Sequence, residues 1–330
     1  MSKKTFVALL AAFFLATTPL SQAQQPMKIP RIGFLSGSGT PSQSSPNENT
    51  TAFRQGLHDL GYVEGKNIII EYRGAGGKME RLPELVAELI GLGVSIIVTT
   101  GMPAVIAAKK ATSTIPIVTA SADNLVDAGI VASLAHPGGN VTGVTRVDAD
   151  FSAKRLQLLK ESFPKLSRVA VLAHGTMGGD EDEFQEIQTA ARKLNIQVQP
   201  FPTPDPSQFP SAFAEMKKKR TDALIFLGSS FTQFHRKQLV ELATKNRLPT
   251  MCSSATWTDV GCVIAYGPKS SELSRRAPVF VDKILKGVKP ADLPVEQPMK
   301  FEFIINLKAA KALNLTIPQS VLFRADKVIQ

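Results

Sequence analysis

An internal repeat is the feature that most limits the folds open to this chain. Each copy holds a helical segment that begins with proline, an apolar run that ends in glycine, another helical segment and another apolar run that ends in serine and alanine. Four matches in the same order are not expected by chance, so the repeat predicts two similar βαβ lobes with a linker near residues 144–150. The matching points are residues 31–35 and 168–172, Pro83 and Pro210, Gly101 and Gly228, and residues 115–122 and 248–255.

Short apolar runs rich in β-branched residues alternate with amphipathic segments along the chain. Strands that are apolar on both sides and separated by helices are typical of parallel sheets covered on both faces. We therefore predict an α/β fold with two doubly wound, Rossmann-like lobes and parallel sheets. The expected strands are residues 31–36, 67–72, 94–99, 115–119, 141–145, 168–173, 196–201, 223–227, 249–252 and 262–266. The expected helices are residues 48–60, 79–91, 102–110, 153–162, 183–194, 208–219, 231–245 and 272–286.

The first residues have the features of an export signal. Two lysines follow Met1, residues 5–18 are nearly all apolar, and small residues precede Ala23. The apolar run is shorter than the roughly 20 residues that span a bilayer. We therefore expect residues 1–23 to be a signal peptide that is cleaved after Ala23, which makes the mature protein periplasmic. An uncleaved anchor is the alternative.

Composition excludes two classes of protein. Hydrophobic residues make up 43% of the chain and charged residues only 20%, which excludes intrinsic disorder as the main state. Lys and Arg number 38 against 28 Asp and Glu, but these bases are mostly spread singly. The one basic run, residues 217–220, falls at the expected C-terminal end of a helix, where cations complement the helix dipole. Because no basic face with interleaved aromatic residues is found, we expect no nucleic-acid partner.

The loops after the expected strands predict where a ligand binds. Open parallel sheets bind ligands outside the carboxyl ends of their strands, and here those loops are rich in glycine and hydroxyl residues. Free amides at helix N-termini attract carboxylates. A turn or capping role explains any single serine, but the repeated placement in both lobes favours a ligand site. The candidate ligand-binding residues are Ser36, Ser38, Thr100, Gly101, Ser121, Asp123, Ser229, Ser230 and Ser254.

Three larger side chains near these loops are further candidates, for selecting the shape of the ligand. His174 ends the strand that matches residues 31–36, so it can face the same site, although a solvated loop histidine is the alternative. Trp257 follows one of the loops, and stacking on a planar ligand and packing inside the lobe are both open to it. Tyr266 ends the next strand.

The sequence holds no recognisable catalytic or metal motif. Phosphate-loop and nucleophile-elbow patterns are missing, and the four histidines have no metal-ligand spacing. Cys252 and Cys262 flank a short segment and can pair as a disulfide in an oxidising compartment, with a nucleophilic cysteine as the less favoured alternative. We expect no enzyme, no cofactor and no metal ion.

Six segments carry motifs that are typical of one protein family. They read RIGFL at 31–35, GYVEGKN at 61–67, EYR at 71–73, TIPIV at 114–118, SLAHPGGNVTG at 133–143 and LKGVKPADLPVEQP at 285–298. In these segments the chain resembles the ABC-transporter substrate-binding proteins related to tryptophan and tyrosine uptake systems, over essentially the whole mature chain. Two positions in expected cleft loops differ from the family pattern: Gly74 stands where tryptophan is usual, and Asn124 begins a stretch where Asp-Pro-Val is common.

The resemblance implies a type I periplasmic-binding-protein fold whose two lobes close on a ligand about a multi-strand hinge. Lobe 1 is then expected to hold residues 28–146 and about 267–294, and lobe 2 residues 147–266 and about 295–330. The implied function is a monomeric extracytoplasmic receptor of an ABC importer. It would bind a small solute, such as an aromatic or other amino acid, and deliver it to an ABC permease in the inner membrane.

Two other functions are alternatives to this one. An exported hydrolase or lyase that uses the same cleft is the alternative, and it would need an acid–base pair that the sequence does not reveal. A sugar-sensing transcription regulator would need a helix-turn-helix domain where the signal peptide stands.

Overall fold

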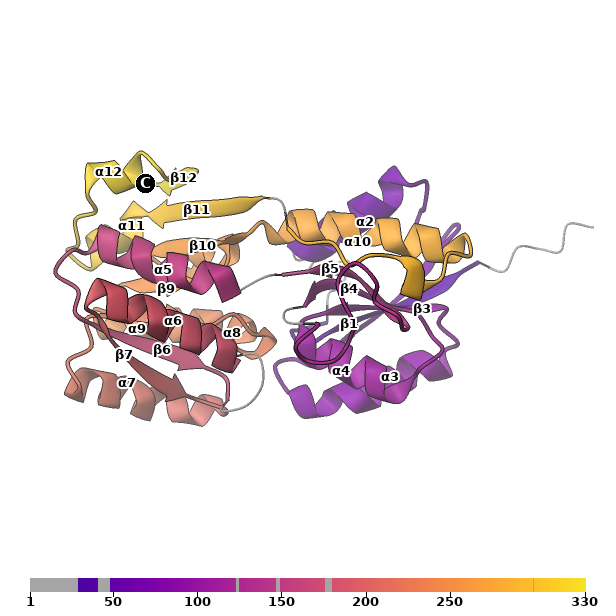
Figure 1. Cartoon of the computed structure of the whole chain (residues 1–330), viewed down its shortest axis with the longest axis horizontal. Coiled ribbons are helices and arrows are strands. Elements are labelled where there is room, and N and C mark those ends of the chain that lie inside the picture. The colour runs from indigo at the N-terminus through magenta and orange to yellow at the C-terminus, as the bar shows by residue number, and fades with distance from the viewer. Residues whose placement is uncertain (1–28, 41–47, 123–124, 147–148, 176–179, 299) are drawn as a thin grey trace, which may run out of the picture.

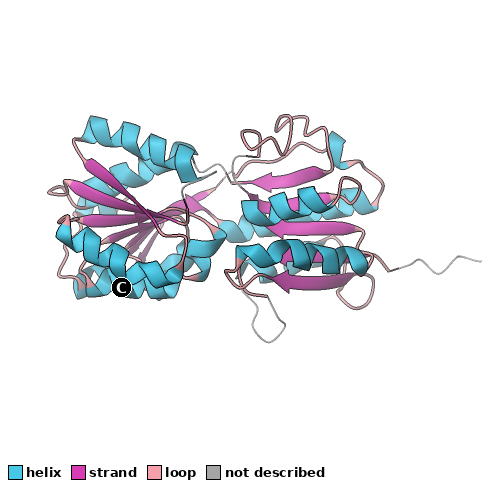
Figure 2. Ribbon diagram, turned by 90° about the horizontal axis from the view of Figure 1, so that it is seen from below, coloured by secondary structure: helices cyan, strands magenta, loops and turns pink. Residues whose placement is uncertain are grey.

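The computed structural model describes residues 29–330 apart from 41–47, 123–124, 147–148, 176–179 and 299. Two lobes lie side by side, and each has a central sheet flanked by helices (Figure 1). Figure 2 shows helices on both faces of the second lobe's sheet. No helix in the described part of the chain is both long and apolar enough to cross a membrane.

The first lobe is built on a five-stranded parallel sheet with the order β2-β1-β3-β4-β5. Because β1 pairs with both β2 and β3, the sheet grows in both directions from its first strand, which is the doubly wound arrangement. The strands are β1 (Arg31–Ser36), β2 (Ile69–Gly74), β3 (Ile96–Thr100), β4 (Ile117–Ala122) and β5 (Val141–Thr145). The helices before β5 are α2 (Glu48–Asp59), the 3₁₀ helix η1 (Met79–Arg81), α3 (Leu82–Gly91) and α4 (Met102–Ala111).

The second lobe is built on a seven-stranded sheet with the order β12-β11-β10-β9-β8-β6-β7. The strands are β6 (Arg168–Ala173), β7 (Gln197–Pro202), β8 (Ala223–Phe226), β9 (Thr250–Cys252), β10 (Ile264–Pro268), β11 (Phe301–Asn306) and β12 (Lys327–Ile329). The helices that follow β5 in the sequence are α5 (Ala149–Ser162), α6 (Asp180–Leu194), α7 (Phe209–Lys218), α8 (Ser230–Phe234), α9 (Arg236–Lys245), α10 (Ser270–Leu285), α11 (Leu307–Ala312) and α12 (Gln319–Leu322). Short 3₁₀ helices are η2 (Pro206–Gln208), η3 (Ala255–Val260) and η4 (Pro290–Asp292).

Apolar side chains cover both faces of each sheet. In β3, Ile97 packs into the cluster that contains α3 and α4, whereas its neighbour Val98 packs into the cluster that contains α2 and α10. Val169 and Ala170 of β6 divide between two clusters in the same way in the second lobe. Burial on both faces explains why these strands are continuous apolar runs in the sequence.

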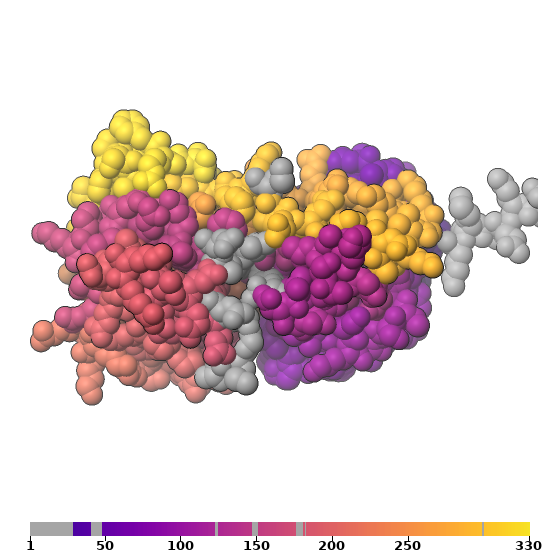
Figure 3. All heavy atoms as spheres, viewed as in Figure 1, coloured from indigo at the N-terminus to yellow at the C-terminus, as the bar shows by residue number. Residues whose placement is uncertain are grey.

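Helix α10 follows a strand of the second lobe in sequence but packs on the first lobe. Phe280 and Val281 of α10 share an apolar cluster with Phe53 and Leu57 of α2. The space-filling view shows this segment covering the upper side of the first lobe (Figure 3). The chain therefore passes between the lobes after β5, after β10 and before β11.

The α/β class and the two doubly wound lobes are confirmed, with one correction to the predicted parallel sheets. Strand β11 runs antiparallel to β10, and neither β11 nor β12 was expected. The single helix expected over residues 231–245 is two helices, α8 and α9, which are separated at His235. The helix expected over residues 79–91 begins as the 3₁₀ helix η1.

Candidate ligand-binding site

The carboxyl ends of β1 and β3 form one rim, on the first lobe. Ser36 is buried, and its hydroxyl accepts a hydrogen bond from the Ser38 amide at 3.1 Å. Gly101 adopts a φ of +82° before α4 begins, and its amide donates to the Ser121 carbonyl at 2.9 Å. Ser36 therefore shapes the loop after β1, and Gly101 makes the sharp turn that aims the N-terminus of α4 at the end of the sheet.

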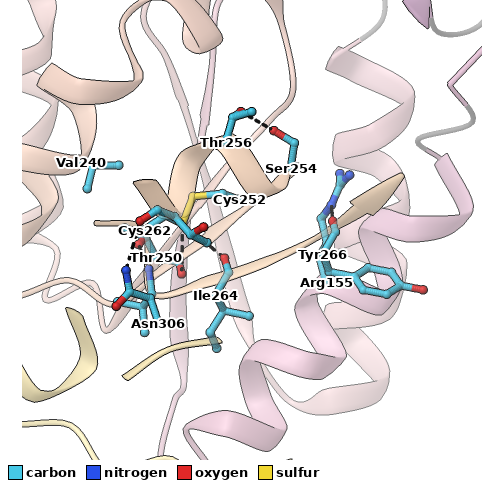
Figure 4. The surroundings of a disulfide bond; sticks show 12 residues. Arg155, Val240, Thr250, Cys252, Ser254, Thr256, Cys262, Ile264, Tyr266 and Asn306 are labelled. Atoms are coloured by element: carbon cyan, nitrogen blue, oxygen red, sulfur yellow. Dashed lines mark hydrogen bonds between the residues drawn. A yellow bond between two sulfur atoms is a disulfide. The ribbon is translucent and has the colours of Figure 1, made fainter. Parts of the chain in front are cut away.

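The carboxyl ends of β8 and β9 form a second rim, on the second lobe. The Ser229 hydroxyl accepts the Thr232 amide at 3.1 Å, while the Thr232 hydroxyl accepts the Ser229 amide at 3.0 Å. This reciprocal cap fixes the start of α8. The Ser254 hydroxyl lies 3.0 Å from that of Thr256, just before η3 (Figure 4).

The two rims face and touch each other. A Cβ atom placed on Gly37 of the first rim would lie 2.7 Å from Cβ of Ser230, and one on Gly101 would lie 2.3 Å from the Ser230 hydroxyl. Residues at strand ends of both lobes, which are far apart in the sequence, are thus brought together. The ligand-binding role that the sequence predicts for Gly101 and Ser230 stays a prediction.

Arg146 is a functional candidate that the sequence reasoning missed. It follows β5 directly, and its amide donates to the Ala122 carbonyl of the first lobe at 2.8 Å. Its guanidinium reaches the second lobe and donates to the Gly228 carbonyl at 3.0 Å. A cation therefore lies between the two rims. The available signal was an arginine at the end of a buried strand, inside the expected linker.

Trp257 packs inside the second lobe, which is one of the two alternatives that the sequence left open. Its side chain is 1% exposed and stacks on Phe226, with ring centroids 4.9 Å apart. Its indole N–H has no hydrogen-bond partner among the described residues. The ring therefore packs between the loop after β9 and Phe226, and it is not exposed at the rim.

Tyr266 lies where the chain passes between the lobes. Its half-buried ring is 6.2 Å from the ring of Phe151 and 6.3 Å from that of Phe301. Burial raises the pKa of its phenol. These three residues flank the segments that link the lobes, so they form an aromatic group beside the rims.

His174 packs behind α8. Its ring stacks on Phe231 with centroids 4.2 Å apart, and Phe231 also lies 4.8 Å from the ring of His235. Burial lowers the pKa of His174, and the neighbouring His235 lowers it further. The pKa of His235 is also lowered by burial, against the opposing effect of Asp205. Both imidazoles pack against Phe231 of α8, the helix that touches the first lobe.

Two of the remaining candidate residues lie at strand ends of the first lobe, and one lies outside the described residues. Thr100 and Ser121 are half-buried at the ends of β3 and β4. Asp123 lies outside the described residues, as does the signal peptide expected over residues 1–23.

Cys252 and Cys262 form a disulfide, which was the favoured of the two sequence alternatives (Figure 4). The bridge closes a loop that carries Ser254 and Trp257. Beside it, the Asn306 side chain donates to the Thr258 carbonyl at 3.1 Å. The second rim is therefore held in place covalently as well as by hydrogen bonds.

One buried charged group lies beneath the second rim. Arg155 is fully buried and pairs with Glu183 at 2.7 Å, while its Nε donates to the Tyr266 carbonyl at 2.8 Å. Glu183 also accepts the Ser152 hydroxyl at 2.6 Å. This network joins α5, α6 and β10. The described residues contain no cluster of His, Cys, Asp or Glu that could hold a metal ion.

A separate groove of about 640 Å³ lies between α5 and α6. Its lining includes Ala153, Gln157, Thr189 and Leu194, and none of the rim residues belongs to it.

Known proteins are similar to this chain in sequence and architecture. The tyrosine-binding protein of Clostridioides difficile (strain R20291) is 26% identical over 263 residues, which cover 80% of this chain and 75% of that protein. An ABC domain from Streptococcus pneumonia in complex with L-Trp is 25% identical, with a TM-score of 0.83 over 92% of this chain and 100% of the other. A conserved domain protein from Vibrio cholerae O1 biovar eltor is 23% identical, with a TM-score of 0.84 over 91% and 100%.

A family model agrees with these similarities. The model described as ABC transporter substrate binding protein matches residues 42–329, which is most of the chain. The match confirms the resemblance carried by the six sequence segments, and the two α/β lobes have the type I periplasmic-binding-protein fold. The chain belongs to the ABC transporter substrate-binding protein family.

Proposed function

We propose that this substrate-binding protein holds its ligand between the two facing rims, and that the ligand is a small carboxylate-bearing molecule of the amino-acid class. The observation that carries the proposal is the position of Arg146, whose guanidinium extends from the end of β5 to the Gly228 carbonyl of the other lobe. A ligand bound beside it can contact both lobes at once.

The chemistry of the rims suits an anion with polar groups. A guanidinium carries five N–H donors in a plane, which matches the two oxygens of a carboxylate. The N-terminus of α4, after Gly101, is the positive end of a helix dipole. Serine and threonine hydroxyls of both rims can donate to or accept from the rest of the ligand.

An aromatic amino acid is the ligand that the relatives favour. One relative is named for tyrosine, and one similar structure contains L-Trp. In this chain, Phe151, Tyr266 and Phe301 supply apolar surface beside the rims. We propose that Arg146 and the candidate residues named from the sequence form the ligand site. Among these candidates, the buried Trp257 would act indirectly, by supporting the loop after β9.

Several further properties follow as proposals. We propose that lobe 1 comprises residues 28–146 and about 267–294, and lobe 2 residues 147–266 and about 295–330. The packing of α10 on α2 and the place of β11 in the second sheet support this division. The mature protein would be a periplasmic monomer, cleaved after Ala23, that passes its ligand unchanged to an inner-membrane permease.

Calorimetric titration with L-tryptophan, L-tyrosine and L-phenylalanine tests the proposal. We expect at least one to bind, and Arg146→Ala to weaken that binding roughly 10- to 100-fold, because a hydrogen bond to a charged group contributes about 1.5–3 kcal/mol. Arg146→Lys keeps the positive charge but lacks the planar set of donors. Its ligand affinity should therefore fall between those of the wild type and Arg146→Ala. Arg324→Ala, which removes an exposed pair with Glu161, is the matched control.

Native mass spectrometry of freshly purified protein extends the search to other ligands. An unmodified bound carboxylate supports the proposal. A bound compound without any acidic group, or equal affinity in wild type and Arg146→Ala, would remove the assigned role of Arg146. Conversion of the bound compound during incubation would indicate an enzyme.

A further inference from the structure

The amino ends of the strands in the second lobe lie at the edge of the sheet opposite the rims. Because the carboxyl ends of β8 and β9 face the first lobe, the loops before β6, β8 and β9 lie at the far end of the molecule (Figure 1). The Asp222 carboxylate accepts the amides of Ser167 and Arg168 at 2.9 and 2.8 Å. The Leu224 amide donates to the Pro249 carbonyl at 3.0 Å. These contacts place three loops side by side, over residues 164–168, 217–222 and 245–249.

Exposed cations gather on these three loops. We call them the basic edge: Lys165, Lys217, Lys218, Arg220, Lys245 and Arg247. Within the part of the chain that the structure describes, none of them forms an ion pair. Two carboxylates beside them are engaged elsewhere, because Asp222 accepts backbone amides and Glu215 pairs with Lys219 at 2.8 Å. The basic edge therefore carries an excess of positive charge.

The fold does not require this charge, as the first lobe shows. In the internal repeat, the loops over residues 217–222 and 245–249 match residues 90–95 and 112–116, which contain no charged residue. Helix α3, which matches α7, has no basic residue in its last turn, whereas α7 has Lys217 and Lys218 there. Complementing the helix dipole is therefore not a sufficient reason for the cations at the end of α7.

Two arginines of the basic edge have a backbone conformation that does not favour a side chain. Arg220 and Arg247 follow α7 and α9 with φ values of +54° and +55°. Glycine is the usual residue in this conformation after a helix. In the first lobe, Gly93, with a φ of +68°, has the place in the repeat that Arg220 has in the second. The second lobe thus has arginine where glycine is less strained, and retained strain of this kind is typical of functional positions.

We propose that the basic edge docks on the phosphate headgroups of an anionic phospholipid membrane. Its cations are spread over the starts of three neighbouring strands, each about 4.8 Å from the next, so they suit an extended array of phosphates better than one small anion. The three loops contain no aromatic side chain, whereas proteins that bind single-stranded nucleic acid stack the bases on aromatic rings. The inference rests on the proposed place of the protein beside an inner-membrane permease, and it does not depend on the ligand site.

Co-sedimentation of the exported, purified protein with lipid vesicles tests this surface. We expect binding to vesicles of phosphatidylglycerol and phosphatidylcholine, none to phosphatidylcholine alone, and release at high salt, because salt screens exposed charges. Each lysine or arginine at an anionic bilayer should raise partitioning about fivefold, so Arg220→Gly/Arg247→Gly should weaken binding roughly 30-fold. This variant should keep the thermal stability of the wild type, because glycine suits the backbone at both positions.

The matched control removes two exposed cations from the first lobe. Lys66→Gln/Lys110→Gln lowers the net charge of the protein by the same amount, and it should bind the vesicles almost as well as the wild type does. An equal loss of binding in both double variants would assign the effect to overall charge and overturn the inference. A wild type that does not bind phosphatidylglycerol vesicles at low salt would overturn it as well.

Two further probes separate the membrane from other phosphates. Calorimetry with free glycerol 3-phosphate should show no binding, and binding that Arg220→Gly/Arg247→Gly abolishes would replace the membrane by a small phosphate ligand. Retention of short duplex DNA, at a salt concentration that releases the vesicles, would assign the basic edge to nucleic acid instead. None of these measurements uses the ligand of the rims. Their failure is therefore distinguishable from a failure of the calorimetric test of the proposed function.

Discussion

At the scale of single residues, burial decides what a conspicuous side chain does. Trp257 is the one tryptophan of the chain, yet its ring is enclosed against Phe226 with its N–H unpartnered among the described residues. Arg146 is inconspicuous in the sequence but reaches across to the opposite lobe. Residue type alone does not reveal this difference in burial and in reach between the two side chains.

Trp257→Ala should cost stability. Truncating a buried aromatic ring leaves a cavity, and the expected loss in the free energy of unfolding is about 3–5 kcal/mol, measured by urea denaturation. Trp257→Phe should lose less, because phenylalanine refills much of the space and removes the unpartnered N–H. If Trp257→Ala abolished ligand binding while stability stayed unchanged, the indole would belong to the ligand site.

The free energy of unfolding should fall as the pH drops below about 6.5. His174 and His235 have pKa values lowered from 6.5 by burial in the folded protein, so the unfolded chain binds more protons in this range. Protonation of carboxylates also lowers the free energy of unfolding, but only at lower pH. His174→Phe keeps the stack on Phe231 and should reduce the loss between pH 7 and pH 5. His136→Asn, in an exposed loop, is the control; an equal change in both variants would contradict the assignment.

At the scale of elements, most strands could be predicted because they are apolar on both faces. Residues 31–36, 141–145 and 168–173 are strands with the predicted bounds. Strands β11 and β12 were missed because their pairing depends on partners elsewhere in the fold. The break at His235 was missed for a related reason: no proline or glycine marks it, and α8 is set by its cap and by contact with the other lobe.

The candidate site could be predicted in part from the topology of a parallel sheet. Strand ends of a parallel sheet lie at one edge, so the hydroxyl-rich loops could be assigned to common rims. The partner of Arg146 could not be predicted, because it depends on how the lobes are placed. The burial of Trp257 likewise depends on the packing of η3 against β8, which local sequence does not reveal.

The close approach of α2 and α10 should reverse the usual effect of a helical glycine. Replacing an exposed glycine by alanine within a helix ordinarily stabilises by about 1 kcal/mol. A Cβ atom on Gly56, however, would lie 2.4 Å from the Arg275 carbonyl oxygen of α10. Gly56→Ala should therefore destabilise by about 1–3 kcal/mol in thermal or urea unfolding. Gly91→Ala, with open space around it, should show the ordinary gain; a gain in both variants would mean that α10 packs less closely.

The disulfide should matter to both stability and binding. Closing a loop of about 10 residues is expected to stabilise by about 2–3 kcal/mol. Reduction with dithiothreitol, or the double variant Cys252→Ser/Cys262→Ser, should lower the urea midpoint. Ligand affinity should fall as well, because Ser254 lies in the closed loop. Equal midpoints with and without reductant would show that hydrogen bonds hold the loop without help.

At the scale of the whole molecule, the lobes are connected by segments that also pair with each other. The Thr145 amide donates to the Glu296 carbonyl at 2.8 Å, and the Glu296 amide donates to the Gly143 carbonyl at 2.9 Å. The side chain of Glu296 is held by Arg276 of α10 at 2.6 Å. We expect linking segments that are paired in this way to limit the lobes to a hinge-like motion, which would bring the same two rims together on closure.

The proposed function requires that the ligand occupies the space between the rims. A crystal structure of the protein with the amino acid that binds in calorimetry tests it most directly. We expect the ligand's carboxylate at Arg146, with further contacts to the loops after β1 and β3 on one side and after β8 and β9 on the other. A ligand that touches one lobe alone, or that lies in the groove between α5 and α6, would contradict the proposed binding site.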